Sequence, residues 1–528
     1  MPHRIVLATL NAKYIHASLG LRYLRANMTR YGGADLDACT TLCEFTIQRA
    51  PQEIADELVG ALGPAQPGDV HIVGLGVYIW NVEATARVIA LLKAQRPDVK
   101  VVLGGPEVSH EQDSQVIVAL SDYVITGWGD LSFPKLCHAL VHGPRPLMKV
   151  IAGEQPALDD IAMPYAQYSD VDLAQRVLYV EASRGCPFKC EFCLSALDKT
   201  AWAFELGGFL AELASLYGRG ARTFKFVDRT FNLKIDASIQ ILEFFLDRLV
   251  AHPHEPLFVH FELVPDQLPD RLKSCIARFP AGVLQFEIGI QSMNPLVQQA
   301  ISRRQDATRT EANLRWLTTH SQAHLHTDLI FGLPGEDWQS FARGFDQLWS
   351  WHPHEIQLGV LKRLRGTPLA VKGHVGMVFQ SEPPYAVSQT DVLSALEVET
   401  FVRLARYWDL VANSGRFSKT LSLLLQGASP FEAFAAFSLW LWHSQGRTSG
   451  LTPEMLVDAL FAYLSLERHV APEHVRDALV ADYIASGARA TPASLRGYLP
   501  SRGARASLAP VEGARHTSRQ KRHAIGLN

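Results

Sequence analysis

Short apolar runs alternate with stretches of helical periodicity along residues 1–145. The apolar runs are Ile5–Leu10, Val70–Val77, Val99–Leu103 and Tyr123–Ile125, and the helical stretches are Leu19–Arg30, Pro51–Leu62, Val82–Gln95 and Ser114–Leu120. This alternation predicts an α/β domain with a parallel sheet and helices on both of its faces. Ligands of such sheets bind beyond the carboxyl ends of the strands.

Glycines stand at the carboxyl ends of three of these runs. They are Gly74 and Gly76, then Gly104 and Gly105, then the glycines of Gly127–Asp130. Glycine permits positive φ angles and lets the backbone approach a bulky ligand closely. The pattern predicts a ligand crevice at this edge of the sheet, and ordinary tight turns are the alternative.

A second α/β unit follows after a proline-bearing stretch, residues 146–176, that predicts an irregular linker. Residues 177–370 contain the strand candidates Val177–Glu181, Thr223–Val227, Leu257–Leu263, Leu284–Ile290, His324–Phe331 and Glu355–Val360. Strands separated by helical stretches predict parallel pairing. The unit is too short for a full eightfold barrel with insertions, so we expect an open or partial barrel.

Residues 371–500 predict a mainly helical domain. Ser429–Glu432 and Thr452–Glu454 each combine a capping residue with proline at the first helical position. Residues 501–528 are basic with few large apolar side chains and predict a disordered tail. A nucleic-acid-binding arm is the alternative for that tail.

Composition narrows the class of protein. The 528 residues are 48% hydrophobic and 20% charged, with a formal net charge of -3, so global disorder is excluded and no charge of one sign points to nucleic acid or anionic membrane. The N-terminus lacks the apolar core of a signal peptide. The most apolar later stretch, Phe431–Trp442, is too short to span a bilayer. These features predict a soluble cytoplasmic protein.

Three of the seven cysteines, Cys186, Cys190 and Cys193, fall within eight positions, directly after the first strand candidate of the second unit. A structural zinc ion normally takes four protein ligands, and a disulfide would leave one cysteine over. A 4Fe-4S cluster with three protein thiolates and one open iron suits the count. Zinc and accidental proximity are the alternatives.

The spacing Cys186-x-x-x-Cys190-x-x-Cys193 after a strand resembles the signature of radical S-adenosylmethionine (SAM) enzymes. Three further motifs resemble that family in the expected order along the chain. They are Phe226–Asn232 with Asp228, Glu287–Ser292 with Gln291 and Ser292, and Asp328–Glu336 with Gly332, Pro334 and Glu336.

This resemblance implies a partial (β/α)6 barrel in which the three cysteines hold the cluster and the open iron binds SAM. A flavodoxin- or ferredoxin-type donor would reduce the cluster, and cleavage of SAM would give a 5'-deoxyadenosyl radical. Gln291 and Ser292 would contact the ribose, or else only cap their strand. Arg303 or Arg304 would pair with the SAM carboxylate, or else form a solvated helix end.

The N-terminal segments Gly74–Asn81, which includes Tyr78, and Gly104–Glu107 resemble the Rossmann-like cobalamin-binding domain that precedes this barrel in one large subfamily. The better-known version of that domain carries D-x-H-x-x-G, whose histidine binds cobalt. Here His16 lacks that context. The resemblance therefore implies cobalamin held in the glycine crevice without a protein imidazole, and axial ligation by His16 is the alternative.

Together these resemblances imply a cobalamin-dependent enzyme that methylates an unactivated carbon of a small molecule or natural product through methylcobalamin. A radical rearrangement, cyclisation or ring contraction is the alternative reaction, and a non-catalytic corrinoid and iron–sulfur sensor is the alternative class. His260 and Glu262 share one face of a strand as catalytic or structural groups. Tyr385, Asn413 and Arg416 suit either a substrate lid or a packing seam of the extension, which resembles one of unknown function.

Overall fold

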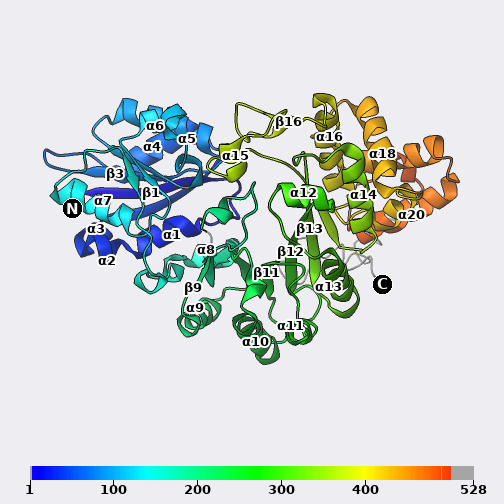
Figure 1. The fold of residues 1–528 in the computed structure, drawn as a ribbon, viewed down its shortest axis with the longest axis horizontal. Helices are drawn as coiled ribbons and strands as arrows, with labels where there is room; N and C mark the ends of the chain where they lie inside the picture. The colour runs from blue at the N-terminus through cyan, green and yellow to red at the C-terminus, as the bar shows by residue number, and fades with distance from the viewer. Residues whose placement is uncertain (1–2, 199, 489, 501–528) are drawn as a thin grey trace. The chain divides into compact units, whose positions relative to one another are not determined.

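The computed structural model describes residues 3–198, 200–488 and 490–500 and shows an α/β protein with a helical C-terminal part (Figure 1). It divides into two compact units. The first unit contains the residues up to Arg229 together with Lys362–Gly373 and Gln380–Ala386. The second contains Thr230–Leu361, His374–Phe379 and the residues from Val387 onward. The predicted basic tail, residues 501–528, lies outside the described residues.

A parallel sheet with strand order β2-β1-β3-β4-β5-β6 forms the centre of the N-terminal part of the first unit. Its strands are β1 (Arg4–Asn11), β2 (Thr40–Thr46), β3 (His71–Gly76), β4 (Lys100–Gly104), β5 (Tyr123–Thr126) and β6 (Val150–Ala152). The expected Rossmann-like α/β architecture is therefore present.

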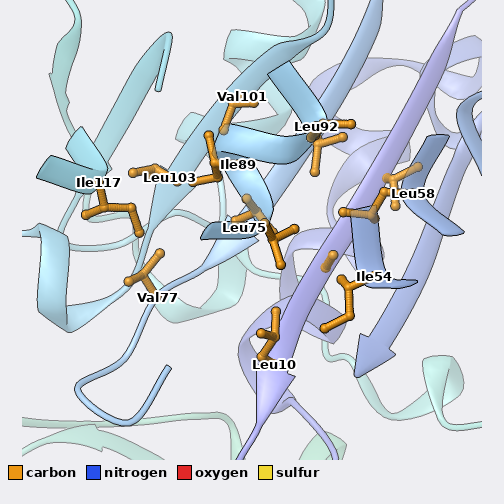
Figure 2. Packing of buried hydrophobic residues seen from close by; sticks show 14 of the residues in the cluster. Leu10, Ile54, Leu58, Leu75, Val77, Ile89, Leu92, Val101, Leu103 and Ile117 are labelled. Carbon is orange, nitrogen blue, oxygen red and sulfur yellow. The ribbon is translucent and has the colours of Figure 1, made fainter. Parts of the chain in front are cut away.

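Helices cover both faces of this sheet because every central strand is apolar on both faces. One face packs on α4 (Pro51–Leu62), α5 (Val82–Gln95) and α6 (Val116–Leu120), as Figure 2 shows for Ile54, Leu75, Ile89, Leu103 and Ile117. The other face packs on α1 (Leu19–Ala26), α2 (Met28–Gly32), α3 (Ala34–Ala38) and α7 (Ser132–His142).

Three local features differ from the sequence-based expectation. Strands β2 and β6 lie at the edges of the sheet and were not predicted, because β2 mixes polar with apolar residues and β6 is only three residues long. Strand β6 and helix α8 (Asp170–Gln175) lie in the stretch expected to be irregular. The expected helix Leu19–Arg30 is interrupted at Asn27. The side-chain amide of Asn27 donates to the carbonyl oxygen of Ala162, and its Oδ1 accepts from the N–H of the same residue.

The rest of the first unit leads to the cysteines. Strands β7 (Leu178–Val180) and β10 (Thr223–Phe226) pair in parallel. Strands β8 (Ser183–Gly185) and β9 (Ala201–Ala203) pair antiparallel. Helix α9 (Leu206–Gly218) follows β9, and the short helix α15 (Pro368–Lys372) also belongs to this unit.

The second unit has parallel strands with neighbours in chain order: β11 (Phe258–Leu263), β12 (Leu284–Gln291), β13 (His324–Phe331) and β14 (Glu355–Val360). Helices α10 (Ile235–Ala251), α11 (Asp270–Ile276), α12 (Pro295–Ala300), α13 (Ala307–His320) and α14 (Trp338–Trp349) connect or follow these strands. The observed strands agree closely with the predicted ones.

The C-terminal part of the second unit is helical, as expected. Its helices are α16 (Ala395–Val411), α17 (Ser418–Leu424), α18 (Pro430–Gln445), α19 (Pro453–Ala462) and α20 (Pro472–Ala485), and a hairpin of β15 (Val378–Phe379) and β16 (Val387–Gln389) precedes them. No helix among the described residues has the length and apolar character needed to cross a bilayer.

Asn413, which follows α16, bonds to the free edge of β14. Its amide nitrogen donates to the carbonyl oxygen of Ile356 at 2.9 Å, and its Oδ1 accepts from the Ile356 N–H at 3.1 Å. The indole of Trp408 donates to the same carbonyl at 2.8 Å. Asn413 therefore has a packing role, which was one of the two roles expected for it.

We predict that Asn413→Ala lowers the free energy of unfolding by about 2–3 kcal/mol, because it leaves a buried backbone N–H of Ile356 without its partner. Urea denaturation followed by circular dichroism measures this change. The exposed Gln426→Ala is the matched control, expected within about 0.5 kcal/mol of wild type. An unchanged midpoint for Asn413→Ala would contradict the prediction.

Candidate functional site

A cavity of about 390 Å³ lies in the first unit, and we call it the glycine cavity. Its volume is within the range of about 300–1,000 Å³ that is common for small-molecule and cofactor sites. The loops after β3, β4 and β5 form one wall, and the segment just before the cysteines forms another. The predicted crevice residues that line it are Gly74, Gly76, Tyr78, Gly104 and Gly105.

Two glycines leave bare backbone facing open space in the glycine cavity. A Cβ built on Gly104 would have the carbonyl oxygen of Ile125 as its nearest neighbour, at 3.8 Å, and one on Gly127 would meet nothing within 4 Å. A larger side chain would therefore fit the protein at Gly104 but would occupy the cavity, whereas at Gly127 the φ of 67° also disfavours any L side chain. The glycines at these positions keep room for a ligand.

Gly74 and Gly105 are glycine for a different reason. A Cβ on Gly74 would lie 2.6 Å from the Phe133 ring, and one on Gly105 would lie 2.5 Å from the carbonyl oxygen of Val77. Gly105 also has a φ of 108°, which L side chains rarely adopt. These two glycines permit close packing behind the cavity wall.

Tyr78 and His16 differ in their relation to the cavity. The ring of Tyr78 lines it and stacks on Trp80 with centroids 4.5 Å apart. His16 is not among the described residues that line the cavity, and its Nδ1 hydrogen-bonds with the Tyr179 hydroxyl at 2.7 Å. The imidazole of His16 therefore has a protein partner. This arrangement is compatible with a ligand that binds in the cavity without contacting His16.

Arg184 carries a buried positive charge into the cavity wall. Its terminal nitrogens donate to Asp130 at 2.9 and 3.1 Å, and its Nε donates to Glu181 at 2.7 Å. The guanidinium carbon lies 4.2 Å from the ring centroid of Tyr23 and 4.9 Å from that of Trp128. Although burial opposes the charge, Glu181 and Asp130 hold the pKa of Arg184 above its ordinary value.

The residues Cys186–Cys193, which we call the cysteine loop, follow β8 directly. Cys186 and Cys190 are buried, Cys193 is half-buried, and the N–H of Cys193 donates to the carbonyl of Cys190 at 3.1 Å. Burial raises the pKa of Cys186 to about 11, and the other two thiols add to the rise. Within the described residues, no three Cys, His, Asp or Glu side chains are arranged as a metal-ligand group. The three thiols share one short loop.

Asp228 stabilises the segment before the cysteine loop. Its carboxylate accepts the hydroxyl of Ser183 at 2.6 Å and the N–H of Ala182 at 3.0 Å. Complete burial raises the pKa of Asp228 to about 7. The structure therefore places this predicted cofactor-binding residue next to the cavity wall, where it acts as an anchor.

In the second unit, the motifs after β12 and β13 meet. The hydroxyl of Ser292 donates to Oε1 of Glu336 at 2.6 Å, and Gln291 has a φ of 73°. Within the described residues, Oε1 of Gln291 and Oε2 of Glu336 are buried acceptors without a hydrogen-bond partner. Burial raises the pKa of Glu336 to about 7. Two buried acceptors that no protein group satisfies suit a ligand that donates hydrogen bonds.

The other residues of the β13 motif form a tight turn. A Cβ on Gly332 would lie 2.5 Å from Cγ1 of Val387, and Gly332 has a φ of 87°. Pro334 is half-buried in the turn that the N–H of Glu336 closes on the carbonyl of Leu333 at 3.1 Å. Gly332 therefore serves packing, and the turn directs Glu336 toward Ser292.

The remaining candidate residues of the second unit differ in their contacts. Arg303 donates to the carbonyl of Gly289 in β12, whereas Arg304 is exposed. His260 has its Nε2 3.1 Å from Oε2 of Glu287 on the neighbouring strand. Arg303 is thus the arginine that lies against the strand carrying the Gln291 motif. The pairing of His260 with Glu287, the first residue of that motif, was not predicted.

Three family models match consecutive parts of the chain. The B12 binding domain matches residues 5–137, the Radical SAM superfamily matches residues 180–348, and a protein family of unknown function, DUF4080, matches residues 373–500. The chain therefore combines an N-terminal B12 binding domain with a radical SAM domain. The resemblance stated from the sequence motifs is therefore confirmed, including the extension.

Curated relatives of this radical SAM protein include methyltransferases. It is 23% identical over 339 residues to 2-(S-pantetheinyl)-carbapenam-3-carboxylate methyltransferase of Streptantibioticus cattleyicolor, covering 58% of this chain and 49% of the relative. It is 24% identical over 349 residues to the cobalamin-dependent radical SAM methyltransferase TokK of Streptomyces tokunonensis, covering 59% and 48%. The chain thus spans about half the length of these relatives.

Two solved structures share the fold of this radical SAM protein. The methyltransferase TsrM from Kitasatospora setae, with cobalamin and a [4Fe-4S] cluster bound, has a TM-score of 0.56 at 16% identity and covers 88% of this chain and 92% of its own. The cobalamin-dependent SAM radical enzyme OxsB, with aqua-cobalamin and SAM bound, has a TM-score of 0.57 at 12% identity and covers 91% and 79%.

Sequence reasoning on this radical SAM protein missed the charges around Arg184. Arg184 stands two positions before Cys186, and its partner Asp130 was noted only as part of a glycine-rich strand end. A charged residue beside a motif of buried thiols was the available signal. It could not name the partner, because Asp130 lies 54 residues away in the chain.

We predict that rising pH destabilises the protein through Glu336. Because the folded pKa is about 7 and the ordinary value is 4.5, the folded state binds the proton more tightly, so its stabilisation is complete below about pH 4.5 and is lost as pH rises through about 7. The loss is about 3 kcal/mol. Urea denaturation at pH 5, 6, 7 and 8 measures it. Glu336→Gln should flatten this part of the profile, and an identical slope in both proteins would contradict the assignment.

Proposed function

We propose that this protein is a cobalamin-dependent radical SAM enzyme that methylates an unactivated carbon of a small molecule. The observation that carries the proposal is the glycine cavity, because its walls come both from the B12 binding domain and from the residues just before the cysteine loop. A ligand in this cavity would lie next to the chain that leads to Cys186. Shared walls of this kind suit chemistry that uses two cofactors together.

The lining of the glycine cavity suits contact with part of a large flat cofactor. Gly104 and Gly127 offer backbone without side chains, and Tyr78 and Trp128 offer aromatic surface. His16 is occupied by Tyr179, so the cofactor would bind without that imidazole. We assign these residues as the part of the chain that would hold cobalamin.

The donor set of the cysteine loop fits a 4Fe-4S cluster. Cys186, Cys190 and Cys193 would supply three sulfur ligands from one short loop, and a cluster with three protein ligands keeps one iron open. Asp228 fixes Ser183 and Ala182 just before the loop. The burial of Cys186 and Cys190 would limit access of water to these two ligands.

The pair Ser292 and Glu336, with Gln291, fits SAM. The buried acceptors of Gln291 and Glu336 suit the ribose hydroxyls and the ammonium group of that molecule, which are hydrogen-bond donors. Arg303 is held against β12 by the carbonyl of Gly289. When bound, the reduced cluster and SAM supply a 5'-deoxyadenosyl radical, and cobalamin supplies a carrier for the methyl group.

We predict that the holoprotein releases both 5'-deoxyadenosine and S-adenosylhomocysteine from SAM. The test is anaerobic reconstitution with iron and sulfide, addition of hydroxocobalamin, gel filtration, and product analysis after reduction. Cobalamin-dependent S-adenosylhomocysteine indicates methyl transfer. Deoxyadenosine without it would reject methylation in favour of a rearrangement, cyclisation or ring contraction, and the absence of both products would reject the enzyme.

Cysteine variants serve as controls in that experiment. Cys186→Ala, Cys190→Ala and Cys193→Ala should each lower deoxyadenosine formation by more than about 100-fold, because even changes outside a metal's ligand set cost about 10–100-fold. Cys43→Ala, a half-buried cysteine of the B12 binding domain, should retain it. Retained SAM cleavage in any of the three loop variants would contradict the ligand assignment.

We predict that Gly104→Leu selectively weakens cobalamin binding. The leucine has open space in the protein, so stability should change by less than about 1 kcal/mol, but the side chain would overlap the cofactor and lower affinity about 10-fold or more. Spectral titration with hydroxocobalamin measures the affinity. Gly60→Leu, on the exposed side of α4 with nothing within 4 Å of its Cβ position, is the matched control. Equal affinity in both variants would place the cofactor elsewhere.

A further inference from the structure

The segment Lys362–Gly373 lies between the radical SAM match, which ends at residue 348, and the DUF4080 match, which begins at residue 373. It nevertheless belongs to the first unit, as does Gln380–Ala386. The two pieces are joined by a bridge between Lys362 and Ala386 and by the Arg363 N–H, which donates to the carbonyl of Tyr385 at 2.9 Å. We call this pair of pieces the clasp.

One end of the clasp holds the loop after β4, Gly104–Glu111. Arg365 donates through Nε to Glu107 at 2.9 Å and through a terminal nitrogen to Glu111 at 2.9 Å. Arg363 makes a bidentate pair with Glu111 at 3.0 Å for both bonds. Bidentate arginine–carboxylate pairs fix orientation as well as distance.

The pair of Arg365 and Glu107 lies where water screens charge weakly. The side chain of Glu107 is only 4% exposed and that of Arg365 is 15% exposed. The hydroxyl of Tyr385 donates to the same oxygen of Glu107 at 2.9 Å. Although burial opposes it, Arg363 and Arg365 keep the pKa of Glu111 below its ordinary value. Breaking such a network would leave buried charge unpaired, which is costly.

Close packing also fixes this end of the clasp. A Cβ on Gly366, which has a φ of 83°, would lie 2.2 Å from the ring of His110. Glu111 itself has a φ of 56°, in the left-handed region that residues other than glycine rarely adopt. The loop after β4 is therefore held in one shape by contacts that come from the clasp.

The other end of the clasp holds the cysteine loop. The Leu369 N–H donates to the carbonyl of Glu191 at 2.9 Å, and Nζ of Lys372 lies 2.6 Å from Oε1 of the same residue. Glu191 stands between Cys190 and Cys193 and is buried. Helix α15 thus binds the cysteine loop through its backbone and through a charge.

We propose that the clasp sets the position of the loop after β4 relative to the cysteine loop, with Arg365 and Lys372 as positioning residues. The inference rests on the proposed function, in which the first loop contacts cobalamin and the second holds the cluster. Because Gly104 and Gly105 line the cavity and Glu191 lies among the sulfur ligands, one short segment fixes both cofactor loops. Loosening one end of the clasp then loosens the loop at the other end.

Hydrogen–deuterium exchange of the full chain, before and after reconstitution, tests this coupling. Arg365→Met should raise amide exchange in Gly104–Glu111 about tenfold and also raise it in Cys186–Cys193, since it removes charge-assisted hydrogen bonds. Lys372→Met removes a lysine that is 59% exposed, so it should raise exchange in both loops by a smaller factor, roughly threefold. Lys372→Arg should restore protection.

Arg49→Met is the matched control, because Arg49 pairs with Glu57 on the surface of the same domain at 2.8 Å. It should change neither cofactor loop. Exchange that rises only in the loop next to each substitution would overturn the coupling. Lys372→Met keeps this test available if Arg365→Met does not fold.

Cofactor content and magnetic resonance of the same samples separate this inference from the proposed function. Reduced holoprotein contains two paramagnetic centres, and their dipolar coupling reports their separation. The coupling should shift or broaden in both clasp variants and stay unchanged in Arg49→Met, with iron and corrin contents maintained. Unchanged coupling would reject the positioning role, whereas a wild-type protein that retains neither cofactor would reject the proposed function and leave the exchange result standing.

Discussion

A buried guanidinium determines how the first unit is assembled. Arg184 lies in the wall of the glycine cavity, and a charge in that environment is stable only with close partners. Its partners come from two places in the chain, Asp130 after β5 and Glu181 after β7. If the B12 binding domain and the segment before the cysteine loop separated, Arg184 and Asp130 would each lose a charged partner. Aromatic rings of Tyr23 and Trp128 cover the same guanidinium and exclude water from the pairs.

The fold was largely predictable because its strands are apolar over several residues. Strands β3 and β11–β14 were predicted nearly to the residue. The edge strands β2 and β6 were not, since β2 mixes polar with apolar residues and β6 has only three residues. The cysteine loop was also predictable, because its chemistry depends on spacing within eight positions. The pairs Arg184–Asp130 and Arg365–Glu107 were not, because their partners lie 54 and 258 residues apart.

Glycines in the predicted crevice illustrate what sequence cannot separate. Gly104 and Gly127 leave space that the protein does not fill, while Gly74 and Gly105 allow contacts that any side chain would block. In the sequence, both kinds are glycine near the end of a strand and cannot be told apart. Among the described residues of the second unit, Gly332 likewise serves packing, whereas the acceptors of Gln291 and Glu336 are hydrogen-bonding groups that no protein group satisfies.

The contact between Asn413 and β14 has a consequence for how the protein behaves when cut or synthesised in part. Strand β14 ends its sheet, and the amide of Asn413 takes the place of a neighbouring strand by satisfying both backbone groups of Ile356. A fragment that stops before α16 would present this unprotected edge to other chains. The helical region therefore prevents other chains from pairing with β14. We expect a protein truncated before α16 to self-associate.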